Sequence, residues 1–517
     1  MAHGLPTIVN AHGSSSELPE DVVVKLPDRF DDQHLVTALE QLYENPGLRA
    51  GYGSAGQQYA LRAHSVEYVA AKYYEAMEQF AEEHPMACEK RTRSRLASND
   101  SILNMSEEDL RYLASAVAAH RQPMGRQRLL LDASGTARID LKTGIQRVAK
   151  QILTALIENP PAQARPETVH DLSGTYTYGR PFTLSMLKLE PVLADDECRL
   201  QPGDIWLGLD IFPLRKEHFE QLRARNIPIY FVVYDLLPVL RPEFFPANAS
   251  TWFRPWLDTI CECADGLICI SRSVADELCA WLEQVPPKRL RPLKIGYFHL
   301  GADIPTSPST SNIEAAEIVK AGDRPSLLMV GTVEPRKGHR QALDAFELLW
   351  AQDVPVNLVI VGKPGWEVEA LIERIKNHKQ LGKRLFWIAQ ADDDVLTTMY
   401  REAAGLLAAS EGEGFGLPLM EAARHGLPII ARDIPVFREV AGEHAYYFDG
   451  TSPQSLAQAI RSWVNLRASG QVTASTGIGW LTWTQSAEQL MRVVMGGAYY
   501  REWLPDTKGA GKCGPAK

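Results

Sequence analysis

Short apolar runs of strand length recur along this chain, and helix-length segments separate them. A strand that is apolar on both faces belongs in a parallel sheet that helices cover on both sides. Strands and helices that alternate in this way build doubly wound sheets, so the pattern predicts an α/β fold. In the first half the expected strands lie at 128–134 (RLLLDAS), 204–210 (DIWLGLD), 227–235 (IPIYFVVYD), 266–271 (GLICIS) and just before 300–303 (LGAD).

The segment GEGFGLPLMEAARHGLP (412–428) places two carboxylates beside a glycine-rich loop. The loop leads into Pro418, a favoured first helical residue, and the helix is expected to end at Gly426. Glu413 then lies in the loop, and Glu421 is expected in the first helical turn. Backbone N–H groups at a helix N-terminus bind phosphate, and glycine lets the ligand come close. With two carboxylates available to sugar hydroxyls, the segment predicts a nucleotide-sugar site.

The stretch from Glu413 to Glu421 resembles the E-G-F-G-L-P-x-x-E motif of the retaining GT-B glycosyltransferases of family 4, and it matches in full. The resemblance covers roughly residues 127–500 and implies a GT-B fold, with two Rossmann-like doubly wound domains facing across a cleft. It also implies a retaining, metal-independent hexosyltransferase that uses a nucleotide diphosphate sugar as donor and needs no cofactor. Further segments resemble the family in the expected order, at 327–339 (LLMVGTVEPRKGH), 358–366 (LVIVGKPGW) and 385–410.

Arg336 and Lys337 follow an expected strand and the turn at Gly331, where ligands bind in such sheets. By resemblance they bind the donor diphosphate, Arg with two donors and Lys as a point charge. By resemblance Glu421 binds the ribose hydroxyls, and Glu413 lies against the donor sugar and supports positive charge at the anomeric carbon. The leaving phosphate accepts the acceptor's proton, so no acid–base pair or nucleophile is expected. Further donor-binding candidates are Gly414, Phe415, Gly416 and Leu417.

Candidates in the first domain leave alternatives open. Gly144 opens the helix 145–159 and would let the loop approach the donor phosphate. Arg147 reaches the acceptor or phosphate, or stays on the helix surface. Asp235 follows a buried strand and either positions the acceptor, as part of the catalytic set, or shapes a turn. Tyr234 replaces a histidine common in relatives and is a weaker acceptor-binding candidate. Ser271 either lines the cleft or caps a helix.

Composition excludes several classes of function. A net charge of −10 argues against a general nucleic-acid binder, and the seven cysteines show no spacing of metal ligands. The run at 392–394 (DDD) is expected to cap a helix rather than bind a metal. No apolar run reaches the ~20 residues of a membrane helix, and no signal peptide is evident, so we expect a cytoplasmic protein. Contact with the inner face of the membrane stays open, because Trp252, Phe253 and Trp256 either pack inside or touch a lipid surface.

The chain contains an internal repeat. HGLPTIVNAHGSSSEL (3–18) parallels HGLPIIARDIPVFREV (425–440) at an offset of 422 residues (425 − 3), and the offset becomes 421 after one gap (456 − 35). Residues 1–85 therefore resemble the tail of an upstream glycosyltransferase-like domain. We hypothesise that the polypeptide is the C-terminal piece of a longer tandem enzyme, or descends from one.

The expected organisation has seven parts. They are the partial repeat (1–85), a helical linker (86–126), the N-terminal Rossmann-like acceptor domain (127–305), a linker (306–323), the C-terminal nucleotide-sugar domain (324–485), a helix crossing back to the N-terminal domain (486–504) and a flexible tail (505–517).

Three segments, TGIQRV, YDLLP and LGAD, most resemble bacterial mannosyltransferases of O-antigen and exopolysaccharide assembly. The resemblance implies transfer of α-mannose from GDP-mannose to a glycan or lipid-linked acceptor. Other donors remain open, namely dTDP-rhamnose, GDP-fucose and UDP-sugars. Other classes also remain open: a sugar-nucleotide epimerase, a phosphorylase, or a non-catalytic scaffold in a polysaccharide assembly complex.

Overall fold

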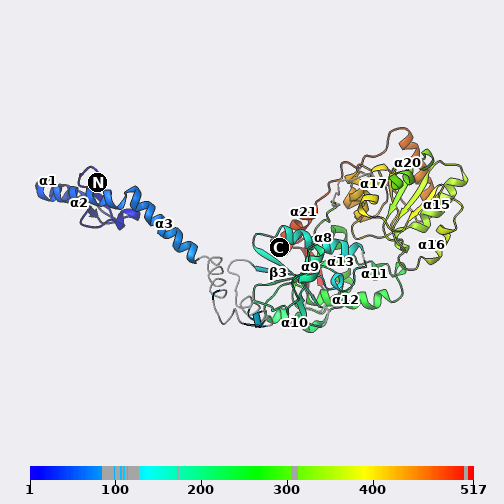
Figure 1. The fold of residues 1–517 in the computed structure, drawn as a ribbon, viewed down its shortest axis with the longest axis horizontal. Helices are drawn as coiled ribbons and strands as arrows, with labels where there is room; N and C mark the ends of the chain where they lie inside the picture. Colours follow the sequence, from blue (N-terminus) through cyan, green and yellow to red (C-terminus); the bar gives the residue numbers. More distant parts are fainter. Residues whose placement is uncertain are drawn as a thin grey trace. The chain divides into compact units, whose positions relative to one another are not determined.

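The computed structural model describes residues 1–83, 127–141, 143–171, 174–303, 313–505 and 511–516, with a few single residues between 98 and 113. It divides into two compact units, Met1–Met124 and Gly125–Lys517 (Figure 1). The helical linker expected over 86–126 lies almost wholly outside the described residues. No helix among the described residues combines the length and apolarity needed to cross a bilayer.

The first sheet of the larger unit has nine strands in the order β17-β16-β9-β8-β7-β6-β3-β4-β5. Six of them, from β9 to β4, are parallel, and antiparallel pairing adds β5 at one edge and β16 and β17 at the other. Every residue of β6, β7 and β8 is buried, as expected of strands covered on both faces. The strands are β3 (Gln127–Asp132), β4 (Ala164–Asp171), β5 (Tyr176–Tyr178), β6 (Ile205–Gly208), β7 (Ile229–Val233), β8 (Gly266–Cys269), β9 (Leu293–Tyr297), β16 (Arg501–Pro505) and β17 (Gly511–Pro515).

Helices alternate with these strands. In this domain they are α7 (Ser134–Arg138), α8 (Gly144–Glu158), α9 (Arg180–Met186), α10 (Lys216–Ala224), α11 (Leu237–Leu240), α12 (Ala249–Cys263) and α13 (Arg272–Gln284). From the aromatic cluster of α12, Phe253 and Trp256 are buried in the core, whereas Trp252 is exposed. Packing therefore accounts for two of the three rings.

The second sheet has six parallel strands in the order β12-β11-β10-β13-β14-β15. In chain order this is 3-2-1-4-5-6, the order of Rossmann sheets, whose ligands bind where the order reverses. The strands are β10 (Ser326–Val330), β11 (Asn357–Val361), β12 (Leu385–Ile388), β13 (Gly405–Ala408), β14 (Ile429–Arg432) and β15 (Tyr446–Phe448). The helices are α15 (His339–Ala351), α16 (Glu369–Lys376), α17 (Asp393–Glu402), α18 (Leu417–Arg424), α19 (Pro435–Ala441) and α20 (Pro453–Ala468).

The C-terminal segment differs from the prediction. Helix α21 (Trp483–Val494) does pack on α8, β8 and β9 of the first sheet, but the expected helix over 486–504 is wrong beyond Met495. Two consecutive glycines end it, and Gly497 adopts a φ of 72°. The chain then continues as β16, with Trp503 buried, and β17 pairs with β16. The tail expected to be flexible over 505–517 is therefore a strand at 511–515.

The expected linker over 306–323 is too long. Its second half folds as α14 (Ile313–Val319), which packs against α17 of the second domain and buries Ala315 and Val319. Residues 304–312 lie outside the described part of the chain.

The smaller unit repeats part of the second sheet. It contains the parallel pair β1 (Ile8–Asn10) and β2 (Val24–Leu26), followed by α1 (Asp32–Glu44), α2 (Pro46–Ala63) and α3 (Val66–Glu83). Ile8 pairs with Val24, and Ile430 pairs with Tyr446, so both strands are shifted by 422 residues (430 − 8 and 446 − 24). The sequence repeat therefore extends to strand register. Leu39 of α1 is 52% exposed, however, whereas its counterpart Ile460 in α20 is fully buried.

Candidate active site

The site lies between β10 and β13, the neighbouring strands at which the order of the second sheet reverses. The loop after β10 carries Arg336 and Lys337, and the loop after β13 carries Glu413. The two loops meet at Gly338, which adopts a φ of 73°. A Cβ at Gly338 would lie 2.4 Å from the carbonyl oxygen of Ala409, so only glycine permits this approach.

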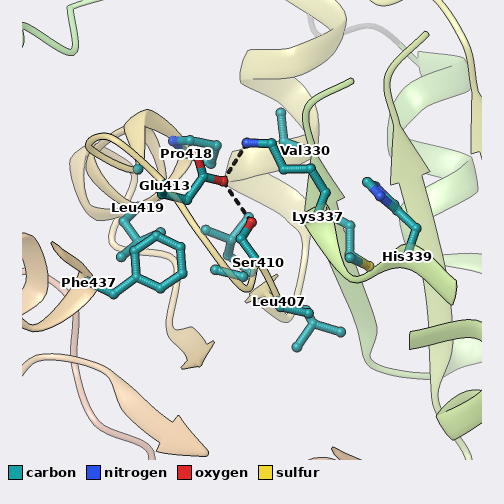
Figure 2. A pocket seen from close by; sticks show the side chains of 14 residues that line it. Val330, Lys337, His339, Leu407, Ser410, Glu413, Pro418, Leu419 and Phe437 are labelled. Carbon is teal, nitrogen blue, oxygen red and sulfur yellow. Dashed lines mark hydrogen bonds and ion pairs between the residues drawn. The ribbon is translucent and has the colours of Figure 1, made fainter. Parts of the chain in front are cut away.

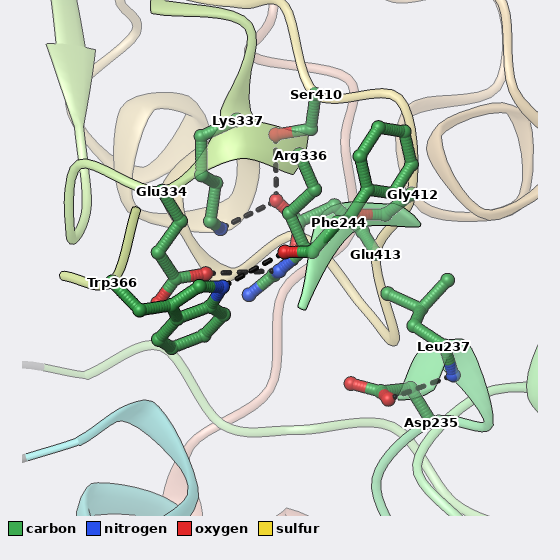
Figure 3. A network of polar contacts seen from close by, with 10 residues as sticks. All are labelled: Asp235, Leu237, Phe244, Glu334, Arg336, Lys337, Trp366, Ser410, Gly412 and Glu413. Atoms are coloured by element: carbon green, nitrogen blue, oxygen red, sulfur yellow. Dashed lines mark hydrogen bonds and ion pairs between the residues drawn. The ribbon is translucent and has the colours of Figure 1, made fainter. Parts of the chain in front are cut away.

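Glu413 is held between two cations (Figure 3). Its Oε2 accepts a hydrogen bond from Arg336 Nη1 at 2.9 Å, and its Oε1 accepts from Lys337 Nζ at 2.5 Å and from Ser410 Oγ at 2.7 Å. The side chains of Glu413, Lys337 and Arg336 are only 10%, 14% and 15% exposed. Burial alone would raise the pKa of Glu413, but Lys337 and Arg336 hold it at about 2. The carboxylate is therefore ionised throughout the physiological range.

Arg336 also donates hydrogen bonds to groups other than Glu413. Its Nε donates to Glu334 Oε2 at 2.9 Å, and its Nη1 donates to the carbonyl oxygen of Gly412 at 3.0 Å. Among the described residues, Nη2 of Arg336 has no hydrogen-bond partner, so it can donate to a ligand without losing an existing bond.

Glu421 lies one position further into the helix than predicted. Gly416, with a φ of 97°, precedes the helix, and Leu417 rather than Pro418 is the first helical residue of α18. Glu421 is therefore past the first turn, where its Oε2 accepts a hydrogen bond from Tyr400 at 2.7 Å. Its Oε1 forms an ion pair of 2.8 Å with Arg147 of the first domain.

Arg147 thus connects the two domains, rather than staying on the helix surface. Thr143 caps α8 through a capping box with Gln146, and Gly144 is the first helical residue. Arg147 lies in the first turn of α8 and points to Glu421 at the opposite side of the cleft.

The side chains of Asp235 and Tyr234 make different contacts. Asp235 lines the cleft and accepts a hydrogen bond from the backbone N–H of Leu237 at 3.1 Å, which shapes the turn after β7. Burial raises the pKa of Asp235, and Arg336 opposes this shift. Tyr234 donates its hydroxyl to the carbonyl oxygen of Leu209 at 2.5 Å inside the core. The expected sugar contact of Tyr234 therefore does not fit the position of its hydroxyl.

Gly414 lies where the two domains approach closely. A Cβ at this position would lie 2.0 Å from the carbonyl oxygen of Tyr234, so no other residue fits without a shift. The carbonyl oxygen of Gly414 accepts a hydrogen bond from Ser271 Oγ at 2.7 Å. Ser271 also caps α13 by accepting from Val274 N–H, so of the two roles left open by the sequence the cap is confirmed; the side chain is buried and does not line the cleft.

These residues line one cleft of about 550 Å³, the size of small-molecule sites. It brings together the predicted donor-binding and acceptor-binding residues: Gly144, Arg147, Tyr234, Asp235, Gly331, Arg336, Lys337, Glu413, Gly414, Phe415, Gly416, Leu417 and Glu421.

The sequence missed several further residues of the cleft and its borders. Ser410 binds Glu413, and its place at the carboxyl end of β13 could have indicated this. Trp366, at the end of the LVIVGKPGW segment, donates its indole N–H to the carbonyl oxygen of Phe244 at 2.8 Å and stacks on Phe245. Glu334, beside Arg336, also lines the cleft. The contacts of Trp366 join distant parts of the chain, so no local pattern marks them.

Glu439 of α19 forms a second connection between the domains. Its carboxylate accepts hydrogen bonds from the backbone N–H groups of Arg272 at 2.7 Å and Ser273 at 2.8 Å, at the N-terminus of α13. Ser273 Oγ lies 2.6 Å from Oε2, and His299 Nε2 lies 2.8 Å from Oε1. A helix N-terminus favours a negative charge. Burial opposes the charge, but these hydrogen bonds hold the pKa of Glu439 at about 2.

The low pKa of Glu439 predicts a pH-dependent stability. Because the pKa is depressed in the folded state from 4.5 to about 2, its stabilising effect is complete above pH 4.5 and is lost as the pH falls towards 2. Between pH 2 and pH 4.5 the ionisation of Glu439 should raise the free energy of unfolding of the unmodified chain by on the order of 3 kcal/mol. We expect Glu439→Gln to lack this rise, which urea unfolding at several pH values measures. Glu443→Gln, at a fully exposed side chain, is the control and should leave the pH profile unchanged.

No group of three or more His, Cys, Asp or Glu side chains within the described ranges could hold a metal ion. Asp392 accepts a hydrogen bond from Val395 N–H at 2.8 Å and caps α17, as the sequence predicted for the run at 392–394.

Comparison with known proteins identifies the second domain. Residues 311–476 match the family model of the glycosyl transferases group 1. Residues 311–476 therefore carry a domain of this glycosyltransferase family. It is 41% identical over 413 residues to the serotype-specific mannosyltransferase WbdA of Escherichia coli, covering 78% of this chain and 50% of WbdA. It is 31% identical over 137 residues to O-antigen chain mannosyltransferase B of Escherichia coli, covering 26% of this chain and 35% of that protein.

The chain thus spans about half the length of the first relatives it matches. Among solved structures, sucrose-phosphate synthase from Thermosynechococcus elongatus superposes with a TM-score of 0.50 at 19% identity, covering 72% of this chain and all of that chain. The GT-B fold predicted from the sequence, with two Rossmann-like domains and a cleft between them, is confirmed for this chain.

Proposed function

We propose that this glycosyltransferase moves α-mannose from GDP-mannose, with retention, to a glycan or lipid-linked acceptor of a bacterial surface polysaccharide. The observation that carries the proposal is the ionised Glu413 held between Arg336 and Lys337 at the sheet's switch point. The printed names of the relatives WbdA and O-antigen chain mannosyltransferase B support mannose as the sugar.

The geometry suits departure of a nucleoside diphosphate. As the bond from the anomeric carbon to phosphate breaks, negative charge grows on the diphosphate and positive charge on the sugar. Lys337 and the unpaired Nη2 of Arg336 can stabilise the first charge, and the Glu413 carboxylate can stabilise the second. The leaving phosphate then accepts the proton of the acceptor hydroxyl. No step in this scheme needs a nucleophilic side chain or a metal ion.

The stereochemistry tests this scheme. With GDP-mannose and a mannose-terminated acceptor, ¹H NMR during turnover should show an α-linked product first, with EDTA present throughout. A β-linked product would contradict retention, and activity lost with EDTA but restored by a divalent ion would contradict metal independence.

Glu421 should act on donor binding more than on the chemical step. Its carboxylate is held by Arg147 and Tyr400, and the resemblance assigns it to the ribose hydroxyls. We expect Glu421→Gln to weaken GDP binding about 10- to 100-fold, the loss typical of hydrogen bonds to a charged group, with a smaller fall in kcat. Isothermal titration with GDP measures the first effect. Glu373→Gln, at an exposed position of α16, is the control and should bind GDP as the unmodified chain does.

A further inference from the structure

The cleft has a part to which the proposed donor contacts give no role. Around Glu413, the side chains of Lys337 and Ser410 point to the carboxylate (Figure 2). The proposed function assigns this part of the cleft to the donor sugar and its diphosphate. The loops that follow β10 and β11 line the cleft as well, and they contribute Glu334 and Trp366.

Backbone hydrogen bonds hold these two loops together. Val333 N–H donates to the carbonyl oxygen of Lys363 at 2.9 Å, and Gly365 N–H donates to the carbonyl oxygen of Val333 at 2.9 Å. A Cβ at Gly365 would lie 2.9 Å from Cγ of Glu334, so the chain just before Trp366 packs directly against the Glu334 side chain. Glu334 and Trp366 therefore form one wall of the cleft (Figure 3).

The ring of Trp366 is held in place by the first domain. Its Nε1 donates to the carbonyl oxygen of Phe244 at 2.8 Å, and its ring stacks on Phe245 with centroids 5.5 Å apart and planes at 22°. Among the described residues, Trp366 lines the cleft but Phe244 and Phe245 do not, so the ring keeps surface that faces the cleft. An aromatic surface fixed in this way stacks on the C–H face of a sugar ring at little cost in side-chain entropy.

Glu334 supplies polar atoms beside this ring. Its Oε2 accepts from Arg336 Nε at 2.9 Å, and a carboxylate has more acceptor sites than this one bond uses. Sugar hydroxyls are suitable donors for them. Arg336 Nη1 also donates to Glu413, so one guanidinium group bridges the two carboxylates (Figure 3). A sugar bound at Glu334 would therefore lie next to a sugar bound at Glu413.

We propose that Trp366 and Glu334 form a subsite for a sugar ring of the acceptor glycan. The sugar stacks on Trp366 and donates its hydroxyls to Glu334, which brings the attacking hydroxyl beside the anomeric carbon of the donor. The subsite rests on the proposed function, which places the donor sugar at Glu413. It gives the acceptor a binding surface of its own, separate from the groups that bind the diphosphate.

A nucleobase is the other flat ligand that could stack on Trp366. The base of the donor is joined to the ribose, however, and the proposed function places the ribose at Glu421. Glu421 contacts Arg147 and Tyr400, whereas the wall is built from Glu334 and Trp366. Because Arg336 connects this wall to Glu413, its place favours the acceptor sugar over the base.

Two substitutions of Trp366 separate stacking from packing. Trp366→Phe and Trp366→Leu both lose the hydrogen bond to Phe244, but only Trp366→Leu loses the flat ring. With a soluble mannose-terminated acceptor, we expect Trp366→Leu to raise the acceptor KM about 10-fold, the effect of losing one aromatic contact. Trp366→Phe should stay within about 3-fold, and both variants should keep the affinity for GDP. Trp480→Leu, at an exposed ring outside the cleft, is the control and should keep the acceptor KM.

An acceptor KM that is unchanged in Trp366→Leu, or raised equally in both variants, would overturn the subsite. A fall in GDP affinity with an unchanged acceptor KM would also overturn it, because it would assign the ring to the nucleobase. Glu334→Gln should raise the acceptor KM as well, since a hydroxyl donates more strongly to a carboxylate than to an amide. An unchanged acceptor KM in that variant would contradict the part assigned to Glu334.

Binding without turnover tests the subsite independently of sugar transfer. Saturation-transfer difference NMR of a methyl mannobioside with the full chain and GDP should show transfer to the ring C–H protons. The transfer should persist in Trp366→Phe and be lost in Trp366→Leu. No transfer in the unmodified chain, or transfer that Trp366→Leu keeps, would contradict the subsite even if the enzyme moves sugar. A mannobioside that binds as expected, together with no sugar transfer from any donor, would contradict only the proposed function.

Discussion

Replacing Glu413 by glutamine is expected to slow sugar transfer about 100- to 1,000-fold, the loss typical when a pre-oriented charge is removed from a reacting centre. Glutamine has nearly the same shape and its one oxygen can still accept from Lys337 and Ser410, so the change removes the charge and the hydrogen bond from Arg336. The fall should appear in kcat, because the carboxylate acts on the positive charge that develops at the anomeric carbon. Steady-state kinetics with GDP-mannose and acceptor measure it.

Glu411→Gln is the matched control, two residues away in the same loop. The Glu411 side chain lies 4.0 Å from Arg241 and does not line the cleft. It should keep kcat within about 2-fold, because exposed ion pairs contribute little. If Glu413→Gln also kept its kcat, the assigned role of the carboxylate would be wrong.

Replacing Arg336 by methionine should destabilise the chain by about 3–5 kcal/mol and abolish transfer, because it removes the cation that pairs with the buried Glu334 and leaves Glu413 with Lys337 alone. Glu334 and Glu413 both bind Arg336, and burial raises the pKa of Glu334 while Arg336 opposes this shift. Urea unfolding at pH 7 measures the loss of unfolding free energy. The double variant Arg336→Met/Glu413→Gln should recover part of it, since one unpaired charge is gone.

Arg340→Met is the control, at an exposed position in the first turn of α15. It should change the unfolding free energy by less than about 0.5 kcal/mol. Equal stabilities of the Arg336 and Arg340 variants would show that the buried charge network does not stabilise the site.

Much of the site could be predicted because its residues follow strands directly. Arg336 and Lys337 come after one apolar run, and Glu413 comes after another. In parallel sheets the carboxyl ends of such strands share one edge, so short-range patterns were enough to group them. The glycines that let the two loops approach lie in the same short segments.

Pairings across the cleft could not be predicted, since they depend on how the two domains face each other. Arg147 meets Glu421, and Glu439 meets the N-terminus of α13, over 274 and 166 residues of sequence (421 − 147 and 439 − 273). The C-terminal strands were missed for another reason. The expected helix continued past Gly496 and Gly497, and a partner strand 206 residues earlier (501 − 295) decided the structure instead.

Acceptor-dependent release of GDP from GDP-mannose, measured in EDTA beside GDP-fucose, dTDP-rhamnose and UDP-sugars, tests the central claim most directly. We predict GDP release from GDP-mannose only when a mannose-containing acceptor is present, and its loss in Glu413→Gln. Release from another donor in preference would contradict mannose as the sugar. No release from any donor by the folded chain, or release without acceptor that Glu413→Gln leaves unchanged, would contradict the assignment of the cleft as a sugar-transfer site.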